Sequence, residues 1–232
     1  MTALAAPKPL AGPRAIWARR IIQLLVGLFI YGIGLALMVR AGIGVAPWDV
    51  LSQGISLRTG LPFGLVTNIV GALVLLLWIP IRVRVGFGTV ANVLLIGTSA
   101  QLGLTFIPQQ TVPWVQGLVF AGGLALVAVA TGLYIGARLG PGPRDGLMTG
   151  LHRRTGWPIW IVRTGIELIV LIAGILLGGQ FGIGTILFAL LIGPMVGVTL
   201  PLLRVPETPV ASDQVETTGA ATDDDYDSSR SA

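Results

Sequence analysis

Two long stretches without a charged side chain constrain this chain more than any other feature. No Asp, Glu, Lys or Arg occurs from Val85 to Ala137 or from Leu168 to Leu203. About 20 helical residues cross the ~30 Å hydrocarbon core of a bilayer, and backbone groups in lipid must be hydrogen-bonded internally. The alternating segments of about ten residues that build a membrane β-barrel are absent from this sequence. We therefore predict an all-α protein that crosses the lipid bilayer several times.

The apolar runs divide into six predicted membrane spans. The longer uncharged stretch is interrupted by "PQQTVPW", whose prolines and glutamines cannot continue a helix in lipid. Trp114, Trp157 and Trp160 fall at predicted span ends, where an indole ring suits the membrane–water interface. The predicted spans are Ile21–Val39, Phe63–Ile81, Phe87–Ile107, Trp114–Gly136, Trp157–Leu177 and Ile183–Leu203.

The distribution of basic residues predicts the orientation in the membrane. With the N-terminus inside, eleven Lys and Arg residues lie in inner segments, whereas the outer loops hold only Arg40 and Arg58. This bias is typical of cytoplasmic loops, so we expect both termini in the cytoplasm. The net charge of +5 belongs to these span ends, and we expect no nucleic-acid binding.

The two ends of the chain differ from the membrane part between them. Residues 1–19 are basic and rich in proline, and we expect a short cytoplasmic N-terminal arm. Residues 205–232 hold seven of the ten acids and few large apolar side chains, so they cannot bury a core. We predict a disordered acidic C-terminal tail, and a tail that binds a regulatory partner is the alternative.

The membrane part contains an internal repeat. "DVLSQGISLRTGLP" from Asp49 aligns with "DGLMTGLHRRTGWP" from Asp145 at a shift of 96 residues, and "GFGTVANVLLIG" aligns with "GIGTILFALLIG" at the same shift. Each copy holds three predicted spans, and an odd number places the second copy upside down in the membrane. Residues 20–110 and 111–204 are therefore predicted to form two inverted three-helix repeats, the plan of many secondary transporters.

Each repeat contains a segment broken by glycine and proline. These segments are "RAGIGVAPWD" from Arg40 and "RLGPGPRD" from Arg138. Matched interruptions of this kind point to the binding site of a transporter with inverted repeats, near the middle of the membrane. A second, compatible interpretation makes Pro47–Leu57 and Arg144–Arg153 short interfacial or re-entrant helices, because the first of them suits a half-buried helix.

Only three acidic residues precede the tail: Asp49, Asp145 and Glu167. A charge at the centre of a bilayer costs at least ~2.5–3.5 kcal/mol, so charges that persist there usually face a cavity or a partner. Asp49 and Asp145 follow prolines at which a helix could begin, so capping of the helix N-terminus competes with a role in binding a substrate or ion.

Glu167 has no acidic counterpart in the first repeat, where the equivalent residue is Gly71. It lies ten residues after Trp157, about 15 Å along a helix and close to the middle of the membrane. Arg163 precedes it by four residues, so an ion pair along the helix is possible. Glu167 then has one of two roles. It holds helices together as a neutral side chain or in a pair with Arg163, or it exchanges a proton or cation.

The basic residues of the broken segments also allow two interpretations. Arg40 and Arg138 anchor the helix ends at the interface, or they pair with the nearby Asp or bind an anion with the loop amides. A metal site, cofactor or catalytic set is not recognisable, because His152 is the only histidine and Cys is absent. We therefore expect no enzyme, and the candidate substrate or ion site comprises Arg40, Asp49, Arg138, Arg144, Asp145, Arg163 and Glu167.

Three motifs together resemble a known family. "RIIQLLVGLFIYGIGLALMVRAGIGVAPWDVLSQGIS", the "GFGT" step and "GPRDGLMTGL" are similar to the YczE/YyaS/YitT family of bacterial integral membrane proteins, and closest to its YczE-type members. The similarity covers about Arg20–Arg204. It implies a protein of the bacterial inner membrane and assigns no functional residue.

Our leading functional hypothesis is a secondary transporter or exporter of a small solute, with its site between the two repeats. The alternative is a non-transporting membrane protein that supports or regulates another enzyme or complex. A transporter predicts a water-lined cavity that reaches the charged residues, whereas the alternative predicts that they are packed shut or face a partner. Six spans are few for a transporter, so a homodimer is plausible.

Overall fold

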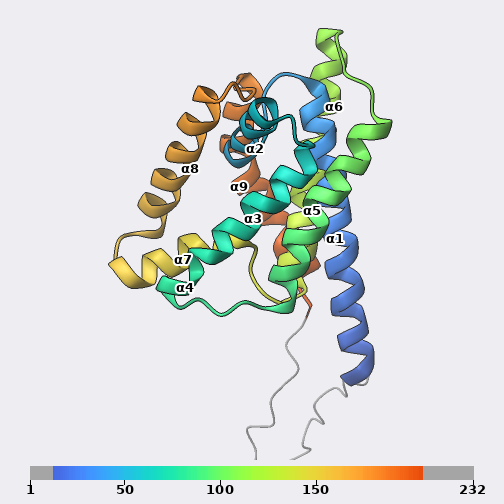
Figure 1. Ribbon diagram of the computed structural model, residues 1–232. Coiled ribbons are helices and arrows are strands. Elements are labelled where there is room, and N and C mark those ends of the chain that lie inside the picture. The colour runs from blue at the N-terminus through green and yellow to red at the C-terminus, as the bar shows by residue number, and fades with distance from the viewer. Residues whose placement is uncertain (1–12, 206–232) are drawn as a thin grey trace, which may run out of the picture.

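The computed structural model describes residues 13–205, and every regular element in that range is an α-helix, as predicted (Figure 1). In chain order the helices are α1 (Pro13–Ala41), α2 (Pro47–Thr59), α3 (Phe63–Leu76), α4 (Trp78–Ile81), α5 (Phe87–Phe106), α6 (Pro113–Gly136), α7 (Pro143–Thr155), α8 (Ile159–Leu176) and α9 (Ile183–Leu203).

Six segments in this range are long and apolar enough to cross a membrane, and they confirm the six predicted spans. They are α1, α3 with α4, α5, α6, α8 and α9. The first helix begins earlier than predicted, at Pro13, so residues 13–19 of the expected arm are helical. Proline is favoured at the first position of a helix, and the Ala and Arg residues that follow are good helix formers. Residues 1–12 lie outside the described range, and so does the expected tail except for its first residue, Val205, which is buried and donates its amide to the carbonyl of Gly136.

Two short helices, α2 and α7, lie near opposite ends of the molecule in Figure 1. Each begins with a proline and ends at a left-handed glycine, Gly60 or Gly156, with φ of 72° in both. Proline lacks an N–H that the first turn would leave unpaired, and glycine adopts positive φ without strain. The short-helix interpretation is confirmed, and each helix extends two residues beyond its predicted C-terminal end.

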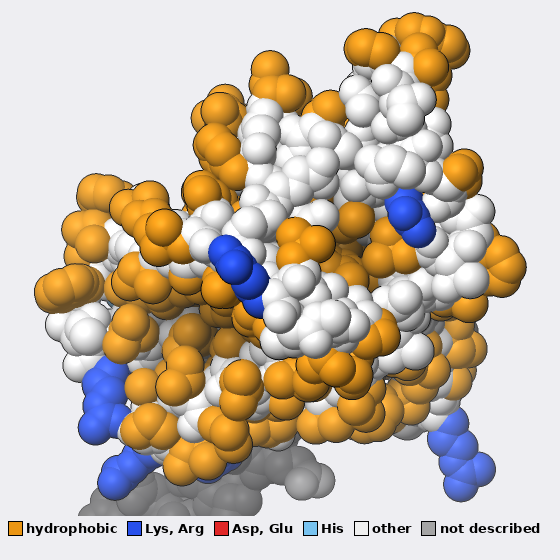
Figure 2. Space-filling model, turned by 45° about the horizontal axis from the view of Figure 1, so that its top comes forward, with side chains coloured by type: hydrophobic (Ala, Val, Ile, Leu, Met, Phe, Trp, Pro, Cys, Tyr) orange, Lys and Arg blue, Asp and Glu red, His pale blue; other side chains and the backbone are white. Residues whose placement is uncertain are grey.

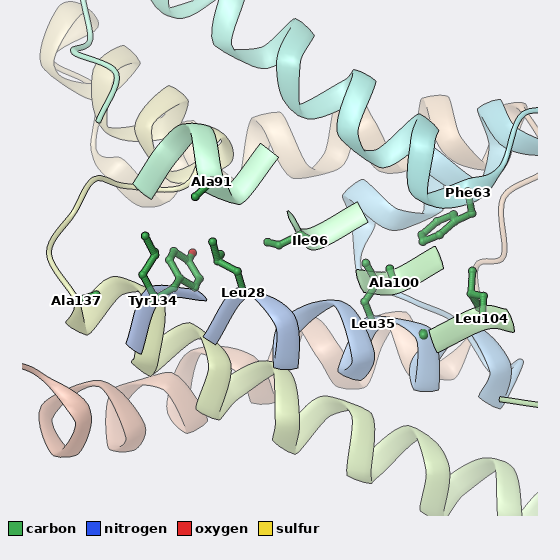
Figure 3. Close-up of a cluster of buried hydrophobic side chains, with 11 residues drawn as sticks. Leu28, Leu35, Phe63, Ala91, Ile96, Ala100, Leu104, Tyr134 and Ala137 are labelled. Atoms are coloured by element: carbon green, nitrogen blue, oxygen red, sulfur yellow. The ribbon is translucent and has the colours of Figure 1, made fainter. Parts of the chain in front are cut away.

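Helix α1 is the centre of the packing, with α5 and α6 against it. A Cβ atom on Gly32 would lie 2.5 Å from the Cβ of Ser99 in α5, and one on Gly27 would lie 2.8 Å from the Cβ of Leu133 in α6. Such close contacts through small residues are typical of membrane helices. Buried apolar side chains from α1, α3, α5 and α6 fill the space around them, as Figure 3 shows for Leu28, Leu35, Phe63, Ile96 and Tyr134.

Three pairs of helices in the two halves begin at equal spacing along the chain. The pairs start at Pro47 and Pro143, at Phe63 and Ile159, and at Phe87 and Ile183, each 96 residues apart. The broken segments also make equivalent contacts with the opposite half. The amide of Gly88 donates to the carbonyl of Leu139, and the amide of Gly184 donates to that of Ile43, both at 2.8 Å. These bonds position α2 and α7 against the starts of α9 and α5.

Candidate functional site

A cavity of about 270 Å³ lies inside the helix assembly, and every helix except α4 contributes to its wall. Much of the wall is apolar, with Trp48, Val70, Ile96 and Phe188 among its residues. Its polar and charged lining consists of Tyr31, Thr67, Asn92, Thr131, Tyr134, Arg144, Asp145, Arg163 and Glu167. Four of the seven candidate site residues therefore meet at one cavity, although they come from two different helices.

A buried ion pair joins the two halves of the chain beside this cavity. Arg144 Nη2 lies 2.9 Å from Asp49 Oδ1, and Asp49 is 2% exposed. The guanidinium carbon of Arg144 also lies 5.3 Å from the centroid of the Trp48 ring, a cation–π arrangement. Burial works to lower the pKa of Arg144, but the attraction of Asp49, Tyr31 and Asp145 and the hydrogen bond to Asp49 together outweigh it, so the net shift is upward. Arg144 therefore remains charged, and it holds α2 and α7 together.

Asp145 contributes a carboxylate directly to the cavity. The hydroxyl of Tyr134 donates a hydrogen bond to Asp145 Oδ2 at 2.9 Å, and Tyr31 packs edge-on against the Tyr134 ring with centroids 6.2 Å apart. Both Asp49 and Asp145 lie in the first turn of a helix, where the helix dipole favours a negative charge. Their hydrogen bonds, however, run to Arg144 and Tyr134 in place of the backbone amides that capping would use.

The predicted ion pair on α8 is present. Arg163 Nε donates to Glu167 Oε1 at 3.1 Å, and both side chains line the cavity. The pair is more accessible than the pair of Arg144 and Asp49, because the Arg163 and Glu167 side chains are 52% and 29% exposed. The cavity therefore has one deeply buried ion pair on one side and one accessible pair on another.

The two remaining candidates, Arg40 and Arg138, are, like Asp49, not part of the cavity lining. Arg40 donates to the carbonyl of Leu104, in the last turn of α5, where helix carbonyls lack partners along the helix. The suggested pairing of Arg40 with Asp49 is wrong, since Asp49 pairs with Arg144. Between them the chain passes through Gly42 and Gly44, both at positive φ, and this turn directs Asp49 into the interior. Arg138 follows α6 at φ 57°.

Several lining residues were missed by the sequence reasoning, which considered only charged groups. Asn92 and Tyr134 lie within the uncharged stretch, and Tyr31 lies within the first span. A polar side chain inside a membrane span is itself a signal, because it needs a hydrogen-bonding partner there. On the outer surface the distribution is reversed: Figure 2 shows a face with many apolar side chains and a few basic ones, and no acidic side chain is in view.

Comparison with known proteins gives a consistent assignment. The chain is similar to an uncharacterized protein of Haemophilus influenzae, with 37% identity over 207 residues that cover 85% of this chain and 95% of the relative. It is 34% identical to the uncharacterized membrane protein YczE of Bacillus subtilis over 177 residues, 75% of this chain and 82% of YczE. YyaS of the same organism is 26% identical over 187 residues, 77% of this chain and 91% of YyaS.

No solved structure matches this chain. The matches with YczE and YyaS confirm the YczE-type resemblance of the motifs. The name of YczE and the six apolar helices agree on a multi-pass membrane protein. The model of the family of unknown function DUF6198 matches residues 18–201, and the chain therefore belongs to that family.

Proposed function

We propose that this protein is a secondary transporter or exporter of a small solute and that the central cavity is its binding site. One observation carries the proposal: Asp145 and Glu167 line this cavity together with Arg144 and Arg163, and the third acid that precedes the expected tail, Asp49, is buried behind the lining and paired with Arg144. Charges are costly in a membrane and persist mainly where they face a pathway or a partner. The volume of about 270 Å³ lies just below the range for ligand pockets, about 300–1,000 Å³, and so suits a small solute.

The same proposal divides the membrane part into two inverted repeats. The equal spacing of helix starts and the paired bonds of Gly88 with Leu139 and of Gly184 with Ile43 support this division. So does the position of α2 and α7 near opposite ends in Figure 1. The cavity would then lie between the repeats, next to the broken segments, as in other transporters of this plan. The excess of basic residues in the expected inner loops supports cytoplasmic termini in a bacterial inner membrane.

The alternative to transport is a role in supporting or regulating another enzyme or complex. That role predicts that the charged residues are packed shut or face a partner. The charged lining of an internal cavity favours transport instead. The proposal contains no catalytic step.

A thermal-shift screen of the purified full chain against small solutes across pH tests the proposal. A solute at one hundred times its dissociation constant stabilises the folded state by about 2.7 kcal/mol, which raises the melting temperature. We expect at least one solute to stabilise the natural protein and to lose this effect with Arg163→Gln. The matched control is Arg153→Gln, an exposed arginine outside the cavity, which should keep the effect. Failure of every solute at every pH would count against transport.

A further inference from the structure

The helices α3 and α5 are locked together by an unusually close contact, which we name the α3–α5 seam and define by Gly64, Asn68, Gly97 and Gln101. A Cβ atom on Gly64 would lie 2.1 Å from the carbonyl oxygen of Gly97, and one on Gly97 would lie 2.1 Å from Asn68 Oδ1. The amide of Gly64 also donates to Gln101 Oε1 at 3.0 Å. This seam is closed.

The residues 96 positions later define the α8–α9 seam: Trp160, Thr164, Gly193 and Gly197. Here the helices are apart, because α8 packs on α2 and α7 but shares no extended interface with α9. A Cβ atom on Gly193 or Gly197 would meet nothing within 4 Å, and Trp160 is 67% exposed. Gly193 also lines the cavity together with Arg163 and Glu167 of α8. The counterpart of the closed seam is therefore open, beside the cavity.

The residues of the open seam are complementary in size. On the closed seam, the small residue Gly64 of α3 faces the large Gln101 of α5. At the equivalent positions of the open seam the large and small residues are swapped: Trp160 of α8 takes the place of Gly64, and Gly197 of α9 takes the place of Gln101. At the other pair of positions a small polar residue and a glycine recur, Thr164 with Gly193. The α8–α9 seam thus has the shapes that a close contact needs.

The first half of α8 is also less tied to its surroundings than the second. Its second half is fixed to α2, where a Cβ atom on Gly174 would lie 2.5 Å from the amide nitrogen of Leu51. Gly156, with φ of 72°, precedes the first half, Gly165 lies near the middle of the helix, and nothing lies within 4 Å of a Cβ atom on either. Residues at element ends that absorb backbone rotation serve as hinges.

We propose that α8 and α9 close on each other in a second conformation, with Thr164 against Gly193 and Trp160 against Gly197, and that the α3–α5 seam opens in exchange. This inference rests on the transport function proposed above. Helix α3 follows α2 and helix α8 follows α7 along the chain, and α2 and α7 lie near opposite ends of the molecule in Figure 1, so the two seams lie toward opposite ends. Exchange between them exposes the cavity first to one side of the membrane and then to the other, which is alternating access.

Disulfide formation tests this closure directly, since the natural chain has no cysteine. A disulfide needs the two Cα atoms within about 7 Å, which helices without a shared interface do not provide. We expect the double variants Thr164→Cys with Gly193→Cys and Trp160→Cys with Gly197→Cys to lose both free thiols under mild oxidation of the full chain in membranes. The product should be a disulfide within one chain, which mass spectrometry identifies.

Two matched pairs serve as controls. Gly71→Cys with Val93→Cys lies on the closed side, where a Cβ atom on Gly71 would be 3.8 Å from Val93 Cα, and this pair should form a disulfide readily. Gly165→Cys with Gly193→Cys moves one partner by a single residue. The equivalent of Gly165 in the first half is Ile69, which is exposed and so points away from the closed seam. The pair of residues 165 and 193 should therefore stay reduced.

Three results would overturn the inference. The first is that neither seam pair reacts while the pair of residues 71 and 93 does. The second is that the pair of residues 165 and 193 reacts as fast as the seam pairs, which would indicate loose motion without a specific contact. The third is a disulfide between two chains, which would place a second copy on α9. A disulfide within one chain, combined with no solute that stabilises the protein, would support the closure and reject transport.

Discussion

At the scale of single residues, the charge balance around the cavity has a direct consequence. Asp49, Asp145 and Glu167 bring three carboxylates, whereas Arg144 and Arg163 bring two guanidinium groups. Two ion pairs account for four of these groups, and Asp145 is left with the hydroxyl of Tyr134 as its hydrogen-bond donor. An uncompensated carboxylate at membrane depth is costly. We therefore expect the bound solute or a coupling ion to present a positively charged group to Asp145.

The accessible acid Glu167 is the residue on which we expect coupling to depend. Glu167→Gln keeps the shape of the side chain but removes its charge and its ability to exchange a proton. If a proton or cation is exchanged here, the stabilisation by a bound solute should depend on pH or cation concentration in the natural protein and lose that dependence in the variant. The thermal-shift assay measures both. Identical behaviour of the two proteins at all pH values would rule out the coupling role.

The pair of Arg144 and Asp49 should instead be important for stability. Arg144→Gln leaves the buried Asp49 carboxylate unpaired, and loss of one partner of a buried ion pair costs about 3–5 kcal/mol. Arg163→Gln is the matched comparison, because its pair with Glu167 is accessible, and such pairs contribute about 1 kcal/mol or less. Unfolding in detergent measures both free energies. The double variant Asp49→Leu with Arg144→Met should recover part of the loss, and equal losses from the two arginine variants would contradict this assignment.

At the scale of helices, close packing through glycine should determine stability where α1 meets α5. Gly32→Ala places a Cβ atom 2.5 Å from that of Ser99, and overpacking of this kind costs about 1–3 kcal/mol. Gly122→Ala in α6 is the control, because nothing lies within 4 Å of its added Cβ atom and alanine is the better helix former by up to about 1 kcal/mol. We expect the melting temperature to fall for the first variant and to stay or rise for the second.

The helices could be predicted from the sequence because their causes are local. Uncharged apolar runs define the spans, and Pro47, Gly60, Pro143 and Gly156 define the short helices through their own backbone preferences. The ion pair along α8 was predicted for the same reason, since four residues make one helical turn. The partner of Asp49 was not, because Arg144 is 95 residues away and only the packing of α2 and α7 brings the two together.

At the scale of the whole molecule, the two halves differ mainly in how their last helices pack. The first half closes α3 on α5, whereas the second leaves α8 separate from α9 and next to the cavity. The loop contacts of Gly88 with Leu139 and of Gly184 with Ile43 are the same in both halves. The packing of the last helices is therefore the feature that the two halves would exchange in a change of conformation. The charged groups that line the cavity come from α7 and α8, so movement of α8 changes the distance between its ion pair and the rest of the site.

The inverted arrangement itself can be tested with two threonines that have the same surroundings. Thr59 ends α2 and Thr155 ends α7; both are exposed, and their hydroxyls donate to the carbonyls of Ile55 and Leu151 at 2.8 and 2.9 Å. In the natural cysteine-free background, we expect Thr59→Cys to react with a membrane-impermeant thiol reagent on intact cells. Thr155→Cys should react only after the cells are made permeable, because inversion places it on the cytoplasmic side with Arg153 and Arg154. Because the local structure is the same at both positions, a difference in labelling can come only from the side of the membrane on which each residue lies. Equal labelling of the two variants on intact cells would contradict the inverted arrangement.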